Sequence, residues 1–431
     1  MPDGSSRSRP TRHRFGKARD EAATDDTDPK PTPRPYRRLP PAITPLAARD
    51  LAAGVVDHRL GRGLKRFREQ IASTLDASST GTYTSFRRAL AACLHKLAAG
   101  ADDGQTTVLI PGFCSQDYSD AIEGVGLTPR RYDIDPRSLS VRMDSLTERT
   151  TDEVLAVVVN NVLGYGSAMT DIAAHCRATD VHLIEAIGYA YGTRYQGDRL
   201  GTFGDCAVMN FQQGKPIPIG GGMVVSQTPT LTFSDEPRPT VTPNVATVAG
   251  YAALGRPRPY YGYTLAKHVA AAFDAAPDRP STHPESKFKI AYEPPFASLA
   301  DFHGAVGRRI LDRLAAHQRQ RAETAKAYAT ALADCPHIGH IQPVTGLTNH
   351  QHVRYPLVVD DPNRRAVIRD ALDGVGVETA ALYDWPPLTA DTVPGAAQLQ
   401  SAILTLPTHP YVDTRDRRLI IETVREAATS G

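Results

Sequence analysis

A single lysine, Lys215, stands between a short apolar run and three consecutive glycines in the segment GDCAVMNFQQGKPIPIGGGMVVS (204–226). The apolar run predicts a buried strand, and the glycines allow the backbone to turn tightly beside a bound molecule. A lysine at the end of a strand is easily desolvated, which favours the neutral, nucleophilic amine that forms a Schiff base with an aldehyde. Lys215 is therefore a candidate anchor for an aldehyde cofactor such as pyridoxal phosphate (PLP). The alternative from spacing alone is a surface lysine before a glycine turn.

The elements that would position this lysine alternate between strand and helix. Four short apolar runs are typical of buried parallel strands, and amphipathic patterns between and around them predict helices. This order predicts an α/β domain with a mainly parallel sheet. The expected strands are TVLIP (107–111), VLAVVVN (154–160), VHLIEA (181–186) and CAVMNF (206–211), and the expected helices are 64–75, 85–98, 115–125, 171–178 and 304–332.

The chain divides into three parts by composition. Residues 1–40 combine Pro, Ser, Asp and Arg with almost no large apolar residue, so they predict a disordered tail. Residues 41–310 contain the alternating strands and helices of the large domain. Residues 311–431, which include RYPLVVD, predict a smaller α+β domain.

Composition excludes several classes of protein. The chain has 431 residues, 41% hydrophobic and 22% charged, and its net charge of +2 is too small to indicate a nucleic-acid surface. No stretch approaches the roughly 20 apolar residues of a membrane span, and the basic N-terminus lacks the apolar centre of a secretory signal. We therefore expect a cytoplasmic protein without membrane or nucleic-acid partners.

The remaining cofactor and metal patterns are absent from the sequence. No GxGxxG follows the first expected strand, and the glycine before Lys215 has neither the spacing nor the following Ser or Thr of a phosphate-binding P-loop. No HExxH occurs, and the five cysteines are scattered singly, so we expect no metal site and no disulfide framework.

The segment 184–226, IEAIGYAYGTRYQGDRLGTFGDCAVMNFQQGKPIPIGGGMVVS, resembles the cofactor-binding core of the DegT/DnrJ/StrS sugar aminotransferases. The resemblance covers most of residues 41–430 in order. It implies the three-layer PLP-transferase fold (type I), with a mainly parallel central sheet and a smaller C-terminal α+β domain. Residues 227–290 are longer than the connection usual in that family. Further similar segments are 58–72, 107–141, 157–176, 304–332 and 406–413.

The resemblance implies that Lys215 binds PLP covalently, but two neighbouring cofactor positions depart from the family. The aspartate that keeps the pyridine nitrogen protonated is Ala186 here. Glu185 is adjacent, yet side chains alternate along a strand, so we expect its carboxylate on the opposite face. The glutamine near the ring hydroxyl is replaced by Tyr189.

The phosphate, ring-stacking and partner-subunit positions also differ. In the family, a Ser-Gly-Thr motif at the start of a helix binds the phosphate. The resemblance places Ser85, Phe86 and Arg87 at these positions, where the helix N-terminus and the guanidinium would hold a phosphate. The stacking aromatic corresponds to Ser115, and the serine five residues before the lysine is Asn210. The segment that reaches the second subunit in the family, like NYRMS, reads FASLA (296–300).

Three interpretations of function follow. The first is a PLP-dependent aminotransferase, acting as a homodimer, that moves an amino group from glutamate to a keto-sugar nucleotide in surface polysaccharide or glycan biosynthesis. The second is a non-catalytic relative that binds or assembles with a partner, which the altered cofactor positions favour. The third is a PLP-dependent sugar dehydratase or isomerase. The retained Lys215 speaks against it, since the family's dehydratases replace that lysine.

Overall fold

A seven-stranded sheet forms the centre of the computed structural model, which describes residues 31–233, 242–273, 296–384 and 386–430. The strand order is β1-β9-β8-β5-β4-β2-β3. The five strands from β8 to β3 run parallel to one another, which confirms the expected mainly parallel sheet. The strands are β1 (Ser79–Tyr83), β2 (Thr107–Pro111), β3 (Thr128–Tyr132), β4 (Val154–Asn160), β5 (His182–Ala186), β8 (Cys206–Asn210) and β9 (Gly222–Ser226).

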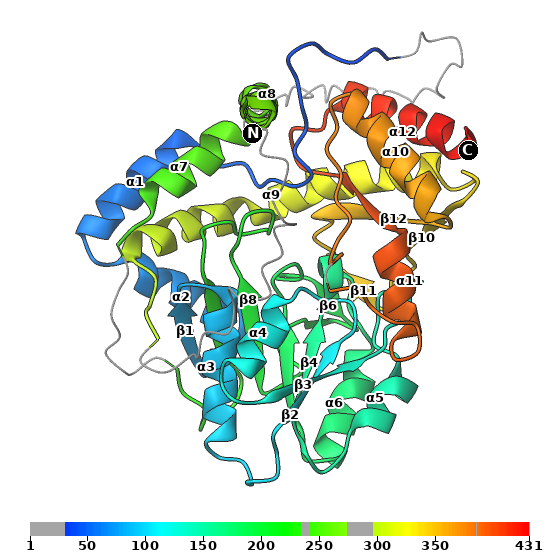
Figure 1. The fold of residues 1–431 in the computed structure, drawn as a ribbon. Helices are drawn as coiled ribbons and strands as arrows, with labels where there is room; N and C mark the ends of the chain where they lie inside the picture. The colour runs from blue at the N-terminus through cyan, green and yellow to red at the C-terminus, as the bar shows by residue number, and fades with distance from the viewer. Residues whose placement is uncertain (1–30, 234–241, 274–295, 385, 431) are drawn as a thin grey trace, which may run out of the picture.

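Helices cover both faces of this sheet (Figure 1). Val157 and Val159 of β4 pack in one apolar cluster, and Val158 between them packs in another. Alternate side chains of one strand therefore contribute to two cores, which explains why the buried strands are apolar throughout. The helices of this part are α1 (Ala48–Arg59), α2 (Gly63–Leu75), α3 (Phe86–Ala98), α4 (Asp117–Glu123), α5 (Met143–Arg149), α6 (Met169–Ala178), α7 (Val245–Leu254), α8 (Pro257–Phe273) and α9 (Asp301–Ala331), with a 3-10 turn at Val162–Gly164.

The antiparallel edge of the sheet decides where Lys215 lies. β9 runs antiparallel to both β8 and β1, with Asn210 opposite Gly222. The segment between β8 and β9, which contains Lys215, therefore turns back at one end of the sheet. Because β8 is parallel to β5, this is the end at which Ala186 closes β5.

The C-terminal part is a smaller α+β unit, as expected. An antiparallel sheet in the order β10-β12-β13 packs with helices from the end of the chain. Helix α9 is continuous across residue 310, so the two units share one long helix. The elements are β10 (Ile338–His340), β12 (Arg354–Val359), α10 (Pro362–Gly374), α11 (Pro394–Ala402), β13 (Ile403–Pro407) and α12 (Thr414–Thr429). A third sheet joins β11 (Leu347–Thr348) to β6 (Arg194–Tyr195) and β7 (Asp198–Arg199).

The end of the expected tail makes defined contacts with this C-terminal unit. Arg34 lies 2.6 Å from Asp413 and Asp416, and Arg37 also binds Asp416, at the start of α12. Leu39 is buried and forms a β-bridge with Val377. The prediction of disorder up to residue 40 is therefore wrong for residues 34–40, because carboxylates distant in sequence pair with their arginines. Residues 1–30 lie outside the described part of the chain.

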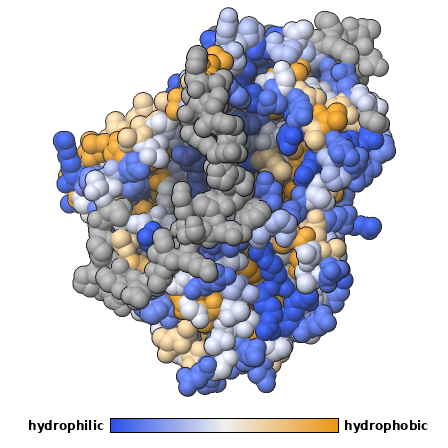
Figure 2. All heavy atoms as spheres, in the orientation of Figure 1, coloured by the Kyte–Doolittle hydropathy of each residue, from blue (hydrophilic) through white to orange (hydrophobic). Residues whose placement is uncertain are grey.

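The long segment 227–290 contributes two helices to the surface. Its residues 234–241 and 274–295 lie outside the described ranges, and the rest includes α7 and α8. Large exposed apolar side chains occur on α1, directly after it, and on α7 and α8: Val55, Val56, Leu60, Leu254, Tyr263, Leu265 and Val269. Figure 2 shows apolar atoms over α1 and α7, at the upper left of the view. Among the described helices, none combines the length and the apolar character needed to cross a bilayer.

Candidate active site

The glycine turn after Lys215 is packed against β1 and the start of α3. Gly221 has φ +83°, and a Cβ there would lie 2.5 Å from the carbonyl oxygen of Tyr83. A Cβ on Gly222 would lie 3.0 Å from the carbonyl oxygen of Ser85. These glycines therefore allow the close approach that the sequence predicts. They bring the loop of Lys215 to the N-terminus of α3.

The amine of Lys215 lies against the ring of Tyr189. The Nζ atom is 3.1 Å from the centroid of that ring, which favours a charged amine. Burial has the opposite and larger effect and lowers the pKa of Lys215. Burial would raise the pKa of Tyr189, but the charges of Lys215 and Arg354 lower it. The amine and the phenol are therefore two neighbouring groups suited to exchange a proton.

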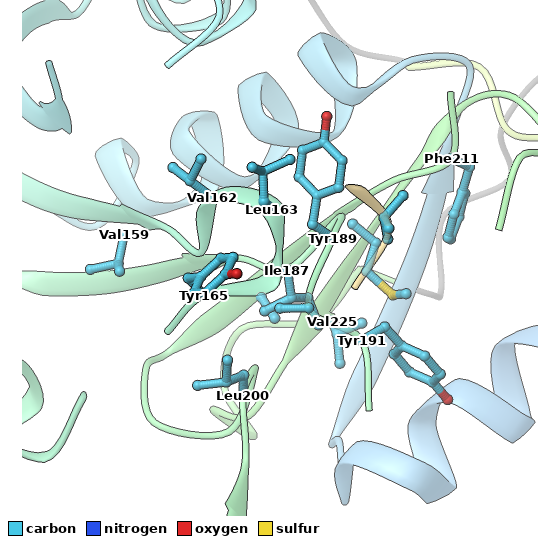
Figure 3. Packing of buried hydrophobic residues seen from close by; sticks show 14 of the residues in the cluster. Val159, Val162, Leu163, Tyr165, Ile187, Tyr189, Tyr191, Leu200, Phe211 and Val225 are labelled. Atoms are coloured by element: carbon cyan, nitrogen blue, oxygen red, sulfur yellow. The ribbon is translucent and has the colours of Figure 1, made fainter. Parts of the chain in front are cut away.

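Tyr189 lies in the apolar core beside Leu163, and its hydroxyl group points away from Ile187 and Val225 (Figure 3). The side chain is 7% exposed, so Lys215 meets a ring held by packing. The sequence predicts Tyr189 near the cofactor ring, and the structure places it directly beside the lysine.

The N-terminus of α3 has the features of an anion site. Ser85 is its N-cap, and the Ser85 hydroxyl accepts a hydrogen bond of 3.2 Å from the backbone N–H of Arg88. The positive end of the helix dipole and the N–H groups of the first helical turn favour a phosphate here. Phe86, which stands where the family has glycine, points into the core and is 2% exposed.

Arg87 is paired with carboxylates from α4. Its Nη1 atom lies 3.2 Å from Asp120 and 3.5 Å from Asp117. The hydroxyl of Ser115 lies 3.5 Å from Asp117, at the limit of a hydrogen bond. Burial raises the pKa of Asp117, while the charges of Arg87 and Lys215 act in the opposite direction. Arg87 and Ser115 thus meet at the carboxylate of Asp117, a residue that the local sequence pattern did not indicate, and the charge of Lys215 acts on the same carboxylate.

We expect Arg87→Gln to weaken PLP binding by about tenfold or more, because a charge-assisted bond to a phosphate contributes roughly 1.5–3 kcal/mol. The matched control is Arg88→Gln, since Arg88 follows directly on the same helix but is exposed. That change should alter the affinity less than about twofold, as is usual for an exposed side chain. Both affinities are measured by spectroscopic titration of the apoprotein with PLP. Equal affinities in the two variants would remove Arg87 from the phosphate site.

Ala186 and Glu185 lie on opposite faces of β5, as the alternation of side chains predicts. Ala186 is 2% exposed and packs in the apolar cluster that contains Val208. The carboxylate of Glu185 accepts backbone hydrogen bonds from Gly201, Phe203 and Gly204, at 2.7–3.2 Å. Glu185 therefore holds a loop and does not replace the aspartate missing at position 186.

Glu185 should make stability depend on pH. Burial raises its pKa from 4.5 to about 7, although three backbone N–H groups act against this. The raised pKa of Glu185 contributes its full stabilisation of the fold below about pH 4.5. This stabilisation is lost as the pH rises through about 7. Relative to Glu185→Gln, the wild-type free energy of unfolding should fall by about 3 kcal/mol over this interval. Urea denaturation of both proteins at several pH values measures it, and a constant difference between them would contradict the prediction.

Two further positions are occupied by contacts within the same chain. The Oδ1 atom of Asn210 accepts a hydrogen bond of 2.9 Å from the backbone of Gln212, so this side chain holds its own loop. In the segment 296–300, the hydroxyl of Ser298 lies 2.8 Å from that of Thr82, and Leu299 contacts the turn at Gly221. This segment packs on β1 beside the glycine turn.

The structure adds residues that sequence reasoning missed. Asn160 ends β4 and is 7% exposed, and its Nδ2 atom has no hydrogen-bond partner among the described residues. Tyr383 and Arg354 come from the C-terminal unit and lie near Tyr189, whose pKa both influence. A polar residue that ends a buried strand was a usable signal for Asn160. Nothing in the local pattern indicated Arg354 or Tyr383.

These residues fit PLP at its aldehyde and phosphate ends. The loop of the buried lysine lies beside a helix N-terminus with a serine cap and an arginine, an arrangement that suits a phosphate. Ala186, at the position where the family has the aspartate for the pyridine nitrogen, offers only a methyl group and no charge. Among the described residues, no cluster of three or more metal-binding side chains occurs.

Comparison with known proteins gives consistent matches. The family described as DegT/DnrJ/EryC1/StrS aminotransferases matches residues 47–234 and 296–425. The chain is 24% identical over 386 residues, 86% of its length and 91% of the relative, to the dTDP-3-amino-3,4,6-trideoxy-alpha-D-glucose transaminase of Micromonospora megalomicea subsp. nigra. It is 30% identical to Protein MosB of Rhizobium meliloti over 196 residues, 44% of this chain and 38% of that protein.

Among solved structures, the aminotransferase TlmJ from Streptoalloteichus hindustanus has the same fold. The TM-score is 0.70 at 24% identity, and the match covers 90% of this chain and 98% of TlmJ. This agreement confirms the type I fold. Because the family pattern covers well over half of the sequence, the chain belongs to the DegT/DnrJ/EryC1/StrS aminotransferase family of PLP-dependent enzymes.

Proposed function

We propose that this aminotransferase transfers the amino group of glutamate to the keto group of a nucleotide-linked sugar, in surface polysaccharide or glycan biosynthesis. The observation that carries the proposal is the amine of Lys215, which lies at the carboxyl end of β8 with a lowered pKa, 3.1 Å from the ring of Tyr189. The name of the Micromonospora relative, a transaminase of a dTDP sugar, supports a nucleotide-sugar acceptor.

PLP, when bound, supplies an aldehyde that accepts an amino group and passes it on. Lys215 would hold the cofactor through its Nζ atom, and the N-terminus of α3 with Ser85 and Arg87 would hold the phosphate. The lowered pKa of Lys215 keeps a larger share of its amine neutral at physiological pH, which is the form that attacks an aldehyde. The same Nζ atom would be suited to move a proton as a general base and acid.

Tyr189 and Asp117 set the charge around that amine. The face of the Tyr189 ring stabilises the protonated amine, and Asp117 adds a negative charge on the side of α4. Burial lowers the pKa of Lys215, and these two groups raise it. The amine of Lys215 can therefore hold a proton after taking it up and before passing it on. Asn210 would keep its place in the loop through Gln212, as its hydrogen bond indicates.

The decisive experiment measures the half-reaction with the purified protein. The protein is loaded with PLP, mixed with glutamate, and assayed for 2-oxoglutarate and for loss of the borohydride-reducible cofactor. A keto-sugar nucleotide added afterwards should regenerate the reducible form. Binding of PLP without formation of 2-oxoglutarate from glutamate would exclude glutamate as donor. Failure to bind PLP at all would favour a non-catalytic role in binding or assembly.

A homodimer is part of the proposal. Large apolar side chains are exposed on α1, α7 and α8, and Leu60, directly after α1, is 58% exposed; exposed apolar surface of this kind supports an interface. The mass of one chain is 46.6 kDa, and light scattering of the purified protein should give twice this mass. The mass of one chain would contradict the proposal.

A further inference from the structure

A cavity of about 410 Å³ lies beside the loop that carries Lys215. Its walls come from the N-terminal segment 40–43, from Gln213 and Gly214, from helices α7 and α8, and from the start of β12. Most of the lining is apolar or aromatic, with Ile43, Tyr251 and Leu254 as examples. The volume is within the range of pockets that bind small molecules. Helices α7 and α8 belong to the segment 227–290, so this chain builds the cavity with its unusually long connection.

Arg354 is the one charged residue among the described residues that line this cavity. Its Nε and Nη1 atoms are buried and have no hydrogen-bond partner in the described part of the chain. Its Nη2 atom would lie 3.4 Å from a Cβ at Gly214, the residue directly before Lys215. The guanidinium therefore lies at the wall of the cavity, next to the loop of the lysine.

The electrostatic effects of Arg354 agree with this position. Burial and, to a smaller extent, the charge of Arg354 lower the pKa of Lys215. Burial acts to raise the pKa of Tyr189, but the charges of Lys215 and Arg354 lower it. A positive group with buried, unsatisfied donors costs free energy unless an anion binds it. The planar fork of a guanidinium suits a carboxylate or a phosphate, which it binds through two hydrogen bonds.

We propose that the cavity beside Gly214 is a substrate subsite in which Arg354 binds an anionic group, carboxylate or phosphate, carried on a compact body that packs against Ile43, Tyr251 and Leu254. The assignment rests on the proposed function, because it takes the ligand to be one of the two substrates. Two sources supply this chemistry: the carboxylate of the amino donor and the diphosphate of a nucleotide-linked acceptor. Each would bring its substrate next to Lys215.

The test is isothermal titration calorimetry of the purified full chain with two probes, L-glutamate and dTDP. We expect one probe to bind, and its identity assigns the source of the anion. Arg354→Gln should weaken that probe by about tenfold or more, and Arg354→Lys should recover part of the loss because it restores the charge without the fork. Leu254→Trp should weaken the same probe by filling the cavity. The control Arg66→Gln changes an exposed arginine of α2 and should have no effect.

Two outcomes overturn the proposal: neither probe binds the wild-type protein, or Arg354→Gln binds as tightly as the wild type. Borohydride-reducible PLP incorporation is measured on the wild-type protein in parallel. Anion binding that depends on Arg354 in a protein that takes up no PLP would overturn the proposed function and leave the anion site established. PLP uptake without such binding would overturn the subsite alone.

Discussion

We expect Lys215→Ala to abolish the borohydride-reducible incorporation of PLP and to lower the rate of amino transfer by about 10²–10⁴-fold. Loss of the amine removes the nucleophile that holds the cofactor and the group that moves the proton, and a positioned acid or base alone contributes a factor of this size. Mass spectrometry after borohydride reduction measures the incorporation, and a half-reaction with glutamate measures the rate.

The matched control for this variant is Lys65→Ala. The Lys65 side chain is 82% exposed on α2 and interacts with Glu69, so its removal should change neither readout. Circular dichroism of Lys215→Ala checks that the fold is retained. Undiminished reducible incorporation in Lys215→Ala would transfer the role of cofactor anchor to another lysine.

The second large effect concerns Ala186→Asp. We expect this change to destabilise the protein by about 1–3 kcal/mol without PLP, because a carboxyl group enters an apolar cluster that offers it no described hydrogen-bond partner. With PLP bound, the carboxylate would face the pyridine nitrogen and raise its pKa. The loss of stability should then be recovered, and the half-reaction with glutamate should accelerate by about tenfold, the equivalent of 1.4 kcal/mol.

Ala186→Asn separates charge from size in this test. The amide has nearly the volume of the carboxyl group but no negative charge, so it should destabilise the protein without accelerating the half-reaction. Thermal unfolding with and without PLP and single-turnover kinetics give the two readouts. If Ala186→Asp folds but no longer binds PLP, position 186 does not face the ring nitrogen and the pocket is arranged differently.

Local sequence patterns predicted the elements that carry the site. The strands at 107–111 and 154–160 begin and end where the sequence indicates, and β5 and β8 differ by one residue. These strands are buried on both faces, so an unbroken apolar run is enough to mark them. The serine that caps α3 was equally readable, since a cap acts within one helical turn.

The sequence did not indicate the antiparallel edge of the sheet or the tail contacts. β1 contains Ser79, Thr80 and Gly81, which lack the apolar run of a buried strand, yet all three are buried because β9 and the chain around Phe233 cover them. The arginines near residue 37 resembled a solvated tail until α12 placed carboxylates opposite them.

By itself, the sequence predicted Lys215 as the candidate to hold the cofactor, since an apolar strand, a lysine and a glycine turn are contiguous in the chain and resemble the family pattern. It also determined that Glu185 faces away from Ala186, because side chains alternate along every strand. Only the tertiary structure decided what surrounds the amine. Tyr189 lies 3.1 Å from it, Asp117 pairs with Arg87, and Arg354 arrives from the C-terminal unit. Charges act through space between residues far apart in sequence, so their effect on the pKa of Lys215 follows from the folded arrangement.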